Sequence, residues 1–422
     1  MKTMKVKKES IYQIIIGVLV LVQVVGIFLG VNYYFKSKDK PTYNPELATY
    51  LLNNHSSSSD ILDTNKYELF VSGETHATQK NFDVEIDIIK NLSQNSDLKY
   101  IIAEYSMANA FLINTYLQTG EISNLDVVFK ELKGTAASNN EFYKFLQDLY
   151  EFNKTLPNDK KLTYLGVDVE HQLNNTIGIL YDIALRNDIY ENIKELIENY
   201  NQQKSNDELL ASLETIYTDI QNNSQMYSDK LGQEFWIFKY LIRNILNTYK
   251  YRIISNDYLQ QSSVRERAMI ENFYEIYNHF PKGKYYGQWG SEHTYLSNVK
   301  TKHLPENEPR LATALNSNED SPVKDKVCSM AIVYFDSFCM NKGSGEPQNI
   351  AVRISNDKNE MDSLKLFAQD NIRFFNLEAE NSPFSKELYL LTDNLTKTGV
   401  TTDYFKNLII VKNSPACTLF NK

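Results

Sequence analysis

The segment that decides the fold is Tyr67-Glu-Leu-Phe-Val-Ser-Gly-Glu-Thr-His76. The apolar residues before Ser72 predict a strand that is buried on both faces, as in a parallel sheet. Gly73 lets the backbone turn where this strand ends. The carboxylate of Glu74 and the imidazole of His76 follow directly. Because open α/β sheets bind their ligands at the carboxyl ends of strands, the segment predicts an α/β fold with a functional site at this point.

A second segment, Lys284-Tyr-Tyr-Gly-Gln-Trp-Gly-Ser-Glu-His293, repeats the arrangement later in the chain. It again has an aromatic strand, and it fits the pattern Gly-x-x-His from Gly290 to His293. The first segment fits the same pattern from Gly73 to His76. Either match alone is weak evidence, because glycine and histidine often occur at this spacing by chance. Together, at two predicted strand ends, they predict that the two histidines face each other across one cleft.

Composition places the chain among globular proteins with a sizeable core. With 42% hydrophobic residues, its 422 residues can form one large α/β domain or two small ones. The net charge of −9 argues against a nucleic-acid partner, since no cluster of lysine and arginine occurs beyond the first residues. None of the three cysteines belongs to a Cys-x-x-Cys pair, which argues against a zinc ribbon or a thioredoxin-like site. Whether Cys328 and Cys339 form a disulfide stays open.

Residues 11–35 predict a membrane anchor. These 25 positions contain no charged residue, and about 20 apolar residues are enough to span a bilayer. A cleaved signal peptide is the alternative, but its apolar part is usually only about 7–15 residues long and ends in small residues. We therefore expect one uncleaved span in the cell membrane, with residues 1–10 in the cytoplasm and the main domain on the extracytoplasmic side. Residues 36–66 are then a linker, and residues 67–422 form the α/β domain.

Two further buried strands are expected within this domain, at residues 98–104 and 162–170. Both carry carboxylates at their ends, Glu104 on the first and Asp168 on the second. Helices are expected around them at residues 81–92, 107–117, 124–133 and 140–153. Three successive strands in β-α-β order therefore deliver charged groups to the same edge of a parallel sheet.

The second half of the domain begins with a long helical insertion at residues 174–280. It contains no proline and only two glycines, which is typical of packed helices, and we expect it to form a cap over the cleft. Strands expected at residues 327–335, 371–376 and 404–411 are placed at the edge of the sheet. The predicted fold is α/β, with a mostly parallel central sheet, flanking helices, the helical cap and an N-terminal transmembrane helix.

Imidazole is the side chain most easily poised as a base near neutral pH. His76 is therefore the candidate that deprotonates water, and Glu74 or Glu104 is positioned to orient it. His293 is predicted to hold the oxyanion or to protonate a leaving group. For each strand-end histidine the ordinary alternative is a hydrogen bond to a backbone carbonyl. For Glu104 and Asp168 the alternative is that they cap the next helix.

An arginine would stabilise negative charge in such a site. Arg265 and Arg267, at the start of the last helix of the insertion, are the candidates, and we assign Arg267 to the site. The alternative is that both pair with glutamates on a solvated helix face. The histidines and Glu104 are also compatible with a divalent metal ion that activates water. No His-Glu-x-x-His, Gly-x-Ser-x-Gly or phosphate-loop motif is present.

Taken in order, these motifs resemble those of the erythromycin esterase-like family. The segments that carry the resemblance are Gly73-Glu-Thr-His76, Ala103-Glu104, Gly166-Val-Asp168, Arg265-Glu-Arg-Ala-Met-Ile-Glu-Asn272 and Gly290-x-x-His293. The family belongs to a wider group with the ChaN-like haem-binding proteins and the TIKI/TraB proteases. The resemblance runs from about Glu68 to Leu296.

The resemblance implies that His76 is a general base with Glu74 and Glu104 as partners, and that His293 and an arginine complete the site. One departure is the single residue between Glu74 and His76, where erythromycin esterases usually have two. TIKI-like members imply metal-dependent peptide cleavage, and ChaN-like members imply haem binding without catalysis. The predicted function is hydrolysis of an ester, lactone or peptide bond in a small-molecule or peptide substrate. The alternative is a haem- or metal-binding protein.

Overall fold

The computed structural model describes residues 43–253, 258–300, 308–350, 358–367, 372–389, 396 and 398–421. The predicted membrane anchor and the predicted cytoplasmic residues before it lie outside these ranges. Among the helices within them, none combines the length and the apolar character that crossing a bilayer requires.

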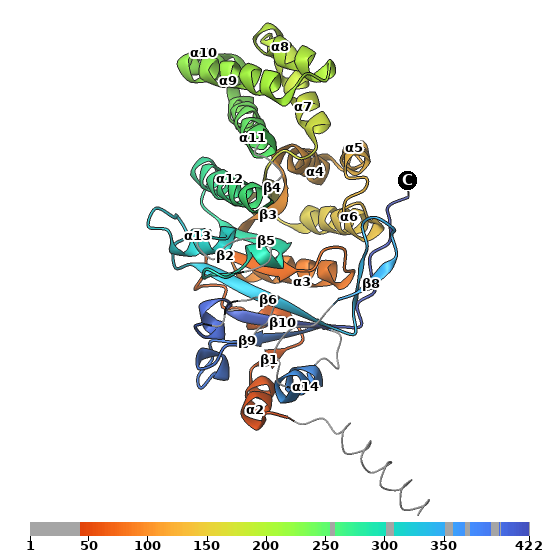
Figure 1. The fold of residues 1–422 in the computed structure, drawn as a ribbon, viewed down its shortest axis with the longest axis vertical. Coiled ribbons are helices and arrows are strands. Elements are labelled where there is room, and N and C mark those ends of the chain that lie inside the picture. Colours follow the sequence, from red (N-terminus) through yellow and green to blue (C-terminus); the bar gives the residue numbers. More distant parts are fainter. Residues whose placement is uncertain are drawn as a thin grey trace, which may run out of the picture.

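A mostly parallel sheet of eight strands forms the centre of the molecule (Figure 1). In spatial order its strands are β1 (His55–Ser56), β9 (Ile372–Asn376), β10 (Asn407–Lys412), β6 (Val327–Phe335), β2 (Leu69–Glu74), β5 (Lys284–Gly290), β3 (Leu98–Ser106) and β4 (Thr163–Asp168). The pairs from β10 to β4 are parallel, whereas β9 and β1 are antiparallel to their neighbours. The predicted α/β fold with a mostly parallel sheet is confirmed.

The two segments that carry Gly-x-x-His are neighbours in this sheet. β2 and β5 run in parallel, and Gly73 and Glu74 lie opposite Trp289 and Gly290. A short 3₁₀ turn, η4 (Ser291–His293), follows β5 directly. The two motifs therefore end at the same edge of the sheet, as the sequence predicts.

The prediction that residues 327–335 lie at the sheet's edge is wrong for β6. This strand pairs in parallel with β2 on one side and with β10 on the other, and all of its residues are buried. An uninterrupted apolar strand has no face suited to solvent, which explains its central position. The edge is formed instead by β1, which pairs with β9. A separate two-stranded sheet contains β7 (Phe338–Met340) and β8 (Pro347–Asn349).

Four helices cover one face of the sheet beside the site. They are α3 (Lys80–Asn95), α4 (Met107–Thr119), α5 (Ser123–Glu131) and α6 (Asn140–Thr155). The side chain of Ser106 caps α4 and that of Asn139 caps α6, each by accepting a hydrogen bond from a backbone N–H of the first turn. These helices share a core with Phe70 and Tyr286, whereas Val71 points into the core on the opposite side.

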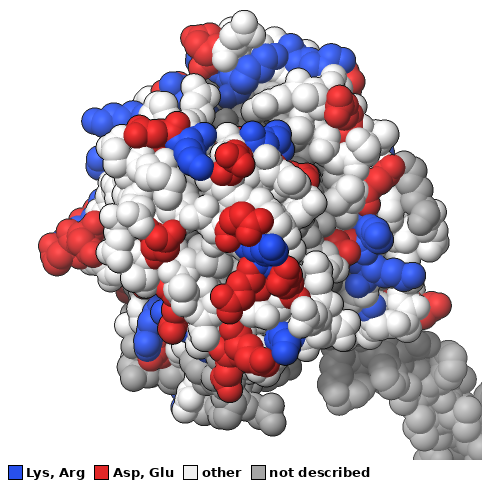
Figure 2. All heavy atoms as spheres, turned by 90° about the horizontal axis from the view of Figure 1, so that it is seen from above, with Lys and Arg blue, Asp and Glu red and all other residues white. Residues whose placement is uncertain are grey.

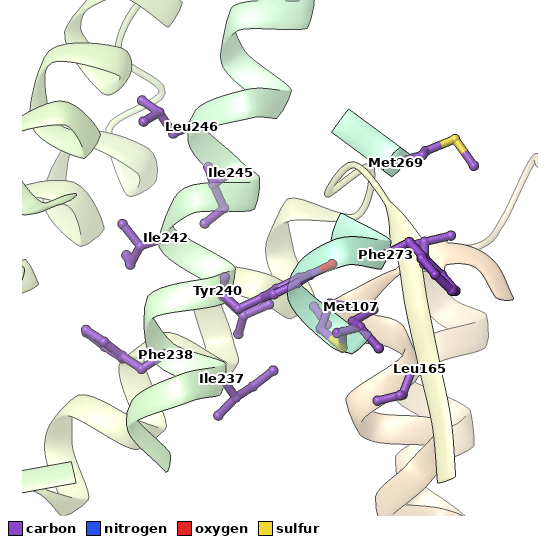
Figure 3. Packing of buried hydrophobic residues seen from close by; sticks show 14 of the residues in the cluster. Met107, Leu165, Ile237, Phe238, Tyr240, Ile242, Ile245, Leu246, Met269 and Phe273 are labelled. Carbon is purple, nitrogen blue, oxygen red and sulfur yellow. The ribbon is translucent and has the colours of Figure 1, made fainter. Parts of the chain in front are cut away.

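Within its described residues, the predicted insertion consists of helices joined by short turns. It contains α7 (Leu173–Arg186), α8 (Tyr190–Asn201), α9 (Asn206–Asn222), α10 (Ser224–Leu231), α11 (Phe235–Ile253) and α12 (Tyr258–His279). Figure 1 shows α8, α9 and α10 at the end of the molecule farthest from the sheet, with α11 and α12 between them and the strands. In Figure 3, Phe238 and Ile242 lie on one side of α11, while Tyr240 on the other side points toward Met107 and Phe273.

The outer face of the insertion is charged. Figure 2, seen from the end where α8 to α10 lie, shows acidic side chains gathered in a band among scattered lysines and arginines. The apolar stripes of these helices instead face inward, where Leu213, Leu241 and Ile245 are fully buried. The insertion is thus an extension of the core on one face of the sheet.

Three short helices and the chain ends complete the fold. Helix α2 (Pro45–Asn53) lies inside the predicted linker and packs against α14 (Lys358–Leu366), while α13 (Leu311–Ser317) packs against α12 and β6. The C-terminal segment crosses the loop after β2, where Thr78 forms an isolated β-bridge with Ala416. All three cysteines, Cys328, Cys339 and Cys417, are unpaired.

Candidate active site

The carboxyl ends of β2, β3 and β4 surround a polar cavity of about 610 Å³. This volume is within the range of sites that bind small molecules, about 300–1,000 Å³. Its acidic and basic lining residues are Glu74, His76, Glu85, Glu104, Asp168, His171, Arg265 and Lys342. Aromatic side chains, among them Phe82, Tyr105, Phe142 and Tyr164, supply much of the remaining wall. The cavity therefore lies where the sequence places the site.

His76 and Glu74 form an ion pair at this cavity, between Nδ1 of the imidazole and Oε1 of the carboxylate. The second oxygen of Glu74 accepts a hydrogen bond from the side-chain amide of Asn81 at the start of α3. Asn81 is fixed in turn by the hydroxyl of Tyr334, which donates to its Oδ1 over 2.6 Å. Asn81 and Tyr334 were missed by the sequence reasoning, because a lone asparagine and a tyrosine on a distant strand belong to no motif.

The backbone after His76 is held in an uncommon conformation. Ala77 has a φ of +60°, in the left-handed region that costs an alanine about 1–2 kcal/mol. Its carbonyl oxygen accepts hydrogen bonds from the backbone N–H groups of Met340 at 3.0 Å and Cys417 at 2.9 Å. Because two separate segments fix this carbonyl, the loop that carries His76 is rigidly placed.

Both glycines of the Gly-x-x-His pattern stand at close approaches between the motifs. A Cβ atom on Gly290 would lie 3.2 Å from Cε1 and Nε2 of His76 and 3.3 Å from Oε2 of Glu104. A Cβ atom on Gly73 would lie 2.5 Å from Oγ1 of Thr294, which follows the second motif. The glycines thus let the two strand ends pack closely enough for their side chains to converge.

Glu104 lies between several of the charged groups of the site. Its Oε1 lies 2.7 Å from Nη2 of Arg265 and 3.2 Å from Nε2 of His293. Its Oε2 accepts a hydrogen bond of 2.7 Å from the backbone N–H of Gly290. Burial alone would raise the pKa of Glu104, but His293, Arg265 and His76 hold it well below the usual range. Glu104 is therefore ionised throughout the physiological pH range.

Of the two candidate arginines, the structure brings Arg265 into the site and places Arg267 elsewhere. Arg265 binds Asp168 through Nε at 2.9 Å and Nη2 at 2.6 Å, in addition to Glu104. Arg267 pairs with Glu308 at 2.9 Å, and its side chain is 61% exposed. The assignment of Arg267 is corrected for a geometric reason, since residues two apart on a helix point to nearly opposite sides.

His293 lies behind Glu104 and does not line the cavity. Its Nδ1 is 2.7 Å from Oε1 of Glu266. The backbone N–H of Leu311 donates to the other oxygen of Glu266 over 2.8 Å. The two histidines therefore both approach Glu104, but only His76 reaches the cavity. Glu266, which the sequence reasoning treated as a surface partner of the arginines, is 2% exposed.

The carboxylates raise the pKa values of both histidines. Glu74 is the main cause for His76, whose pKa rises to about 9. The side chain of His76 is 55% exposed, so water in the cavity screens part of this attraction. Burial would lower the pKa of His293, but Glu266 and Glu104 outweigh it and raise the pKa to about 10. His293 is 12% exposed and is a permanent cation at neutral pH.

The groups proposed as metal ligands do not surround a common point. Within the described ranges, no set of three or more His, Cys, Asp or Glu side chains is arranged to hold a metal ion. Of the candidate ligands, His293 has a carboxylate beside each ring nitrogen. The two oxygens of Glu104 already contact the side chain of Arg265 and the backbone N–H of Gly290. These residues thus fit an alternating network of charges better than a coordination sphere. The haem prediction rests on resemblance and stays a prediction.

Within its described residues, the insertion lines the cavity through Arg265. His171 and Gln172 precede α7, and Nε2 of His171 lies 3.3 Å from Oδ2 of Asp168. Arg265 comes from α12. Within the described residues, α8 to α11 supply no lining residue, whereas the segment between α5 and α6, including Ala136 and Asn139, forms the opposite wall.

Comparison with known sequences supports the resemblance found in the motifs. The sequence profile of the erythromycin esterase family matches residues 94–286, somewhat less than half of the chain. This range contains Glu104, Asp168 and Arg265 but neither His76 nor His293. No curated protein matches the sequence.

Several solved structures share the fold over most of the chain. A Bacillus cereus protein is 18% identical, with a TM-score of 0.66 over 90% of this chain and 100% of its own. A succinoglycan biosynthesis protein is 14% identical, with a TM-score of 0.64 over 88% and 98% of the two chains. A mutant of the erythromycin esterase EreC in its open conformation is 12% identical, with a TM-score of 0.62 over 85% and 94%. These identities establish a common fold only.

Proposed function

Starting from the resemblance to the erythromycin esterase family, we propose that this protein hydrolyses a carboxylic ester or lactone bond. The observation that carries the proposal is the pair of His76 and Glu74 at the edge of a polar cavity. A carboxylate-oriented imidazole beside a water-accessible cavity is the arrangement that general base catalysis requires. The chemistry is described below for an ester, and a peptide bond would follow the same steps.

His76 is the base that activates water. Nδ1 faces Glu74, so Nε2 is the nitrogen left to take a proton from a water molecule in the cavity. Glu74 keeps the remaining proton on Nδ1 and stabilises the imidazolium that forms as water attacks the carbonyl carbon. Asn81 prevents Glu74 from rotating away, because it donates to the second carboxylate oxygen.

Arg265 stabilises the negative charge on the attacked carbonyl oxygen. Its Nε and Nη2 atoms are held by Asp168 and Glu104, and within the described chain no residue accepts a hydrogen bond from Nη1. The side chain lines the cavity and is 24% exposed, which leaves Nη1 available to the oxyanion. His293 is a positioning residue in this scheme, because it acts on substrate only by holding Glu104 and thereby Arg265.

Hydrolysis of p-nitrophenyl acetate and of the erythromycin lactone tests the proposal. We expect the wild type to cleave at least one of them and His76→Gln to lose about 100-fold or more in kcat/KM. His279→Gln is the matched control, because His279 stacks on Trp236 with 4.2 Å between ring centroids and lies outside the cavity lining. No hydrolysis by the wild type, or equal loss in both variants, would refute the proposed function.

We also propose that residues 11–35 anchor this domain to the cell membrane and that the domain is extracytoplasmic, with the insertion acting as a cap that limits access to the cavity. The uncharged length of that segment supports the anchor. Full-length protein should stay in the membrane pellet after washing with alkaline carbonate, and protein without residues 1–36 should move to the supernatant. Release of the full-length chain by the wash would contradict the anchor.

A further inference from the structure

One ionisable group in the cavity takes no part in the scheme above. Glu85 lies on α3, one turn after Asn81, and it lines the cavity although its side chain is only 8% exposed. Within the described chain its carboxyl group has neither a hydrogen bond nor an ion pair. Its oxygens are not among the fully buried polar atoms that lack a hydrogen-bond partner, so the carboxyl group borders the cavity and can act on a molecule bound there.

The surroundings of Glu85 keep its carboxyl group neutral. The titratable groups that influence it or are influenced by it are Glu74 on β2, Tyr105 on β3, Tyr164 on β4 and Tyr286 on β5. None of them supplies positive charge. Burial, together with the negative charge of Glu74, raises the pKa of Glu85 to about 8.

We infer that Glu85 is the general acid that protonates the leaving alcohol, the partner of His76 across the same cavity. This inference rests on the proposed hydrolase function and deepens it. Glu74 links the two groups, because it pairs with His76 on one side and acts electrostatically on Glu85 on the other. Near neutral pH both groups carry a proton, because the pKa of His76 is about 9 and that of Glu85 about 8, and the reactive form is the fraction in which His76 has lost its proton while Glu85 keeps its own.

The step balances as follows. His76 has taken one proton from the attacking water, and the tetrahedral intermediate carries its negative charge beside Arg265. The bond between the carbonyl carbon and the alcohol oxygen then breaks, and the proton of Glu85 moves to that oxygen. The products are a carboxylic acid and an alcohol, with Glu85 ionised and His76 protonated. Transfer of the proton from His76 to Glu85 through cavity water restores the starting state.

Two esters with different leaving groups test this role. p-Nitrophenolate departs as an anion and needs no proton, whereas the ethoxide of ethyl acetate does. We expect Glu85→Gln, which keeps the size of the side chain, to lower kcat/KM for ethyl acetate about 100-fold or more and to change that for p-nitrophenyl acetate less than about threefold. Glu85→Asp, which keeps the acid, should recover part of the loss. Asp83→Asn, on the exposed side of the same helix, should change neither.

The ratio of kcat/KM for ethyl acetate to kcat/KM for p-nitrophenyl acetate isolates the role of Glu85 further, because the ionisation of His76 affects the hydrolysis of both esters equally. In the wild type this ratio should be constant at low pH and fall tenfold per pH unit above about 8, where Glu85 loses its proton. In Glu85→Gln it should be low and independent of pH. An equal loss for both esters, no loss for either, or a wild type that cleaves only p-nitrophenyl acetate would overturn the role of Glu85 and leave the hydrolase standing. A wild type inactive on both would refute the hydrolase and this role with it.

Discussion

The buried charge of His293 gives a prediction whose magnitude follows from the structure. His293 contacts Glu266 through one ring nitrogen and Glu104 through the other, at 2.7 and 3.2 Å. In His293→Gln the cation is lost, and both carboxylates stay buried without it. Removing one partner of a buried ion pair typically costs about 3–5 kcal/mol, because the other charge is left uncompensated.

The raised pKa gives an independent value for the same change. His293 has a pKa of about 10 in the folded state and about 6.5 when unfolded. Each pKa unit is worth about 1.4 kcal/mol, so the charged ring contributes about 4 kcal/mol to the free energy of unfolding at pH 7. Because the side chain is 12% exposed, solvent screening reduces this value little. The value from the pKa shift therefore falls within the range expected for removing one partner of a buried ion pair.

The sign of the pH dependence is also fixed. A group whose pKa is raised on folding stabilises fully below its unfolded pKa, and this stability is lost as the pH rises through the folded pKa. The difference between wild type and His293→Gln should therefore shrink from about 4 kcal/mol at pH 7 to about 1.5 kcal/mol at pH 9. Taking the difference cancels the contributions of the titrating groups on which His293 does not act.

Urea denaturation of both proteins, followed by tryptophan fluorescence at a series of pH values, measures this difference. His279→Gln serves as the control, since burial lowers the pKa of His279 and no carboxylate acts on it. Its effect should not diminish toward pH 9. A loss below about 1 kcal/mol for His293→Gln at pH 7, or a loss that stays constant up to pH 9, would refute the buried charge network.

Three further predictions follow from the site. The kcat/KM for p-nitrophenyl acetate should rise with pH up to about 9, where His76 loses its proton, and then level off; a flat profile would exclude His76 as the base. Arg265→Gln should destabilise by about 3–5 kcal/mol in urea titrations, against less than about 1 kcal/mol for the exposed Arg267→Gln, and equal effects would contradict the placement of the two arginines. Gly290→Ala should lower hydrolysis about 10- to 100-fold by displacing the ring of His76, whereas Gly178→Ala, with no atom near the new methyl group, should leave activity intact.

Much of the fold could be predicted because the strands of an α/β sheet are apolar and end in recognisable residues. The strand expected at residues 98–104 and the aromatic strand expected within residues 284–293 correspond to β3 and β5, and the place of their ends at the carboxyl edge follows from parallel pairing. The order of strands could not be obtained this way. The apolar run of β6 fits any interior position, and only its pairing with β2 makes it central.

The site was predictable as far as its residues belonged to motifs. Glu104 and Asp168 lie near the carboxyl ends of buried strands, so local sequence places them at the cavity. The choice between Arg265 and Arg267 depends on the rotation of α12 about its axis. The sequence around the two arginines does not determine this rotation. Glu85 was missed because a single glutamate in an amphipathic helix is expected to lie on the solvated face. Its burial becomes apparent only when the strands are packed against α3.

The position of α12 has a mechanical consequence. Two adjacent residues of this helix, Arg265 and Glu266, hold Asp168, Glu104 and His293 through contacts of 2.6 to 2.9 Å around the strand ends. Lifting α12 from the sheet would separate several buried ion pairs at once, and a single buried charge left without its partner typically costs about 3–5 kcal/mol. We therefore expect α12 to move with the sheet. The helices from α8 to α10 make none of these contacts, so we expect changes in their sequence to leave the proposed catalytic groups undisturbed.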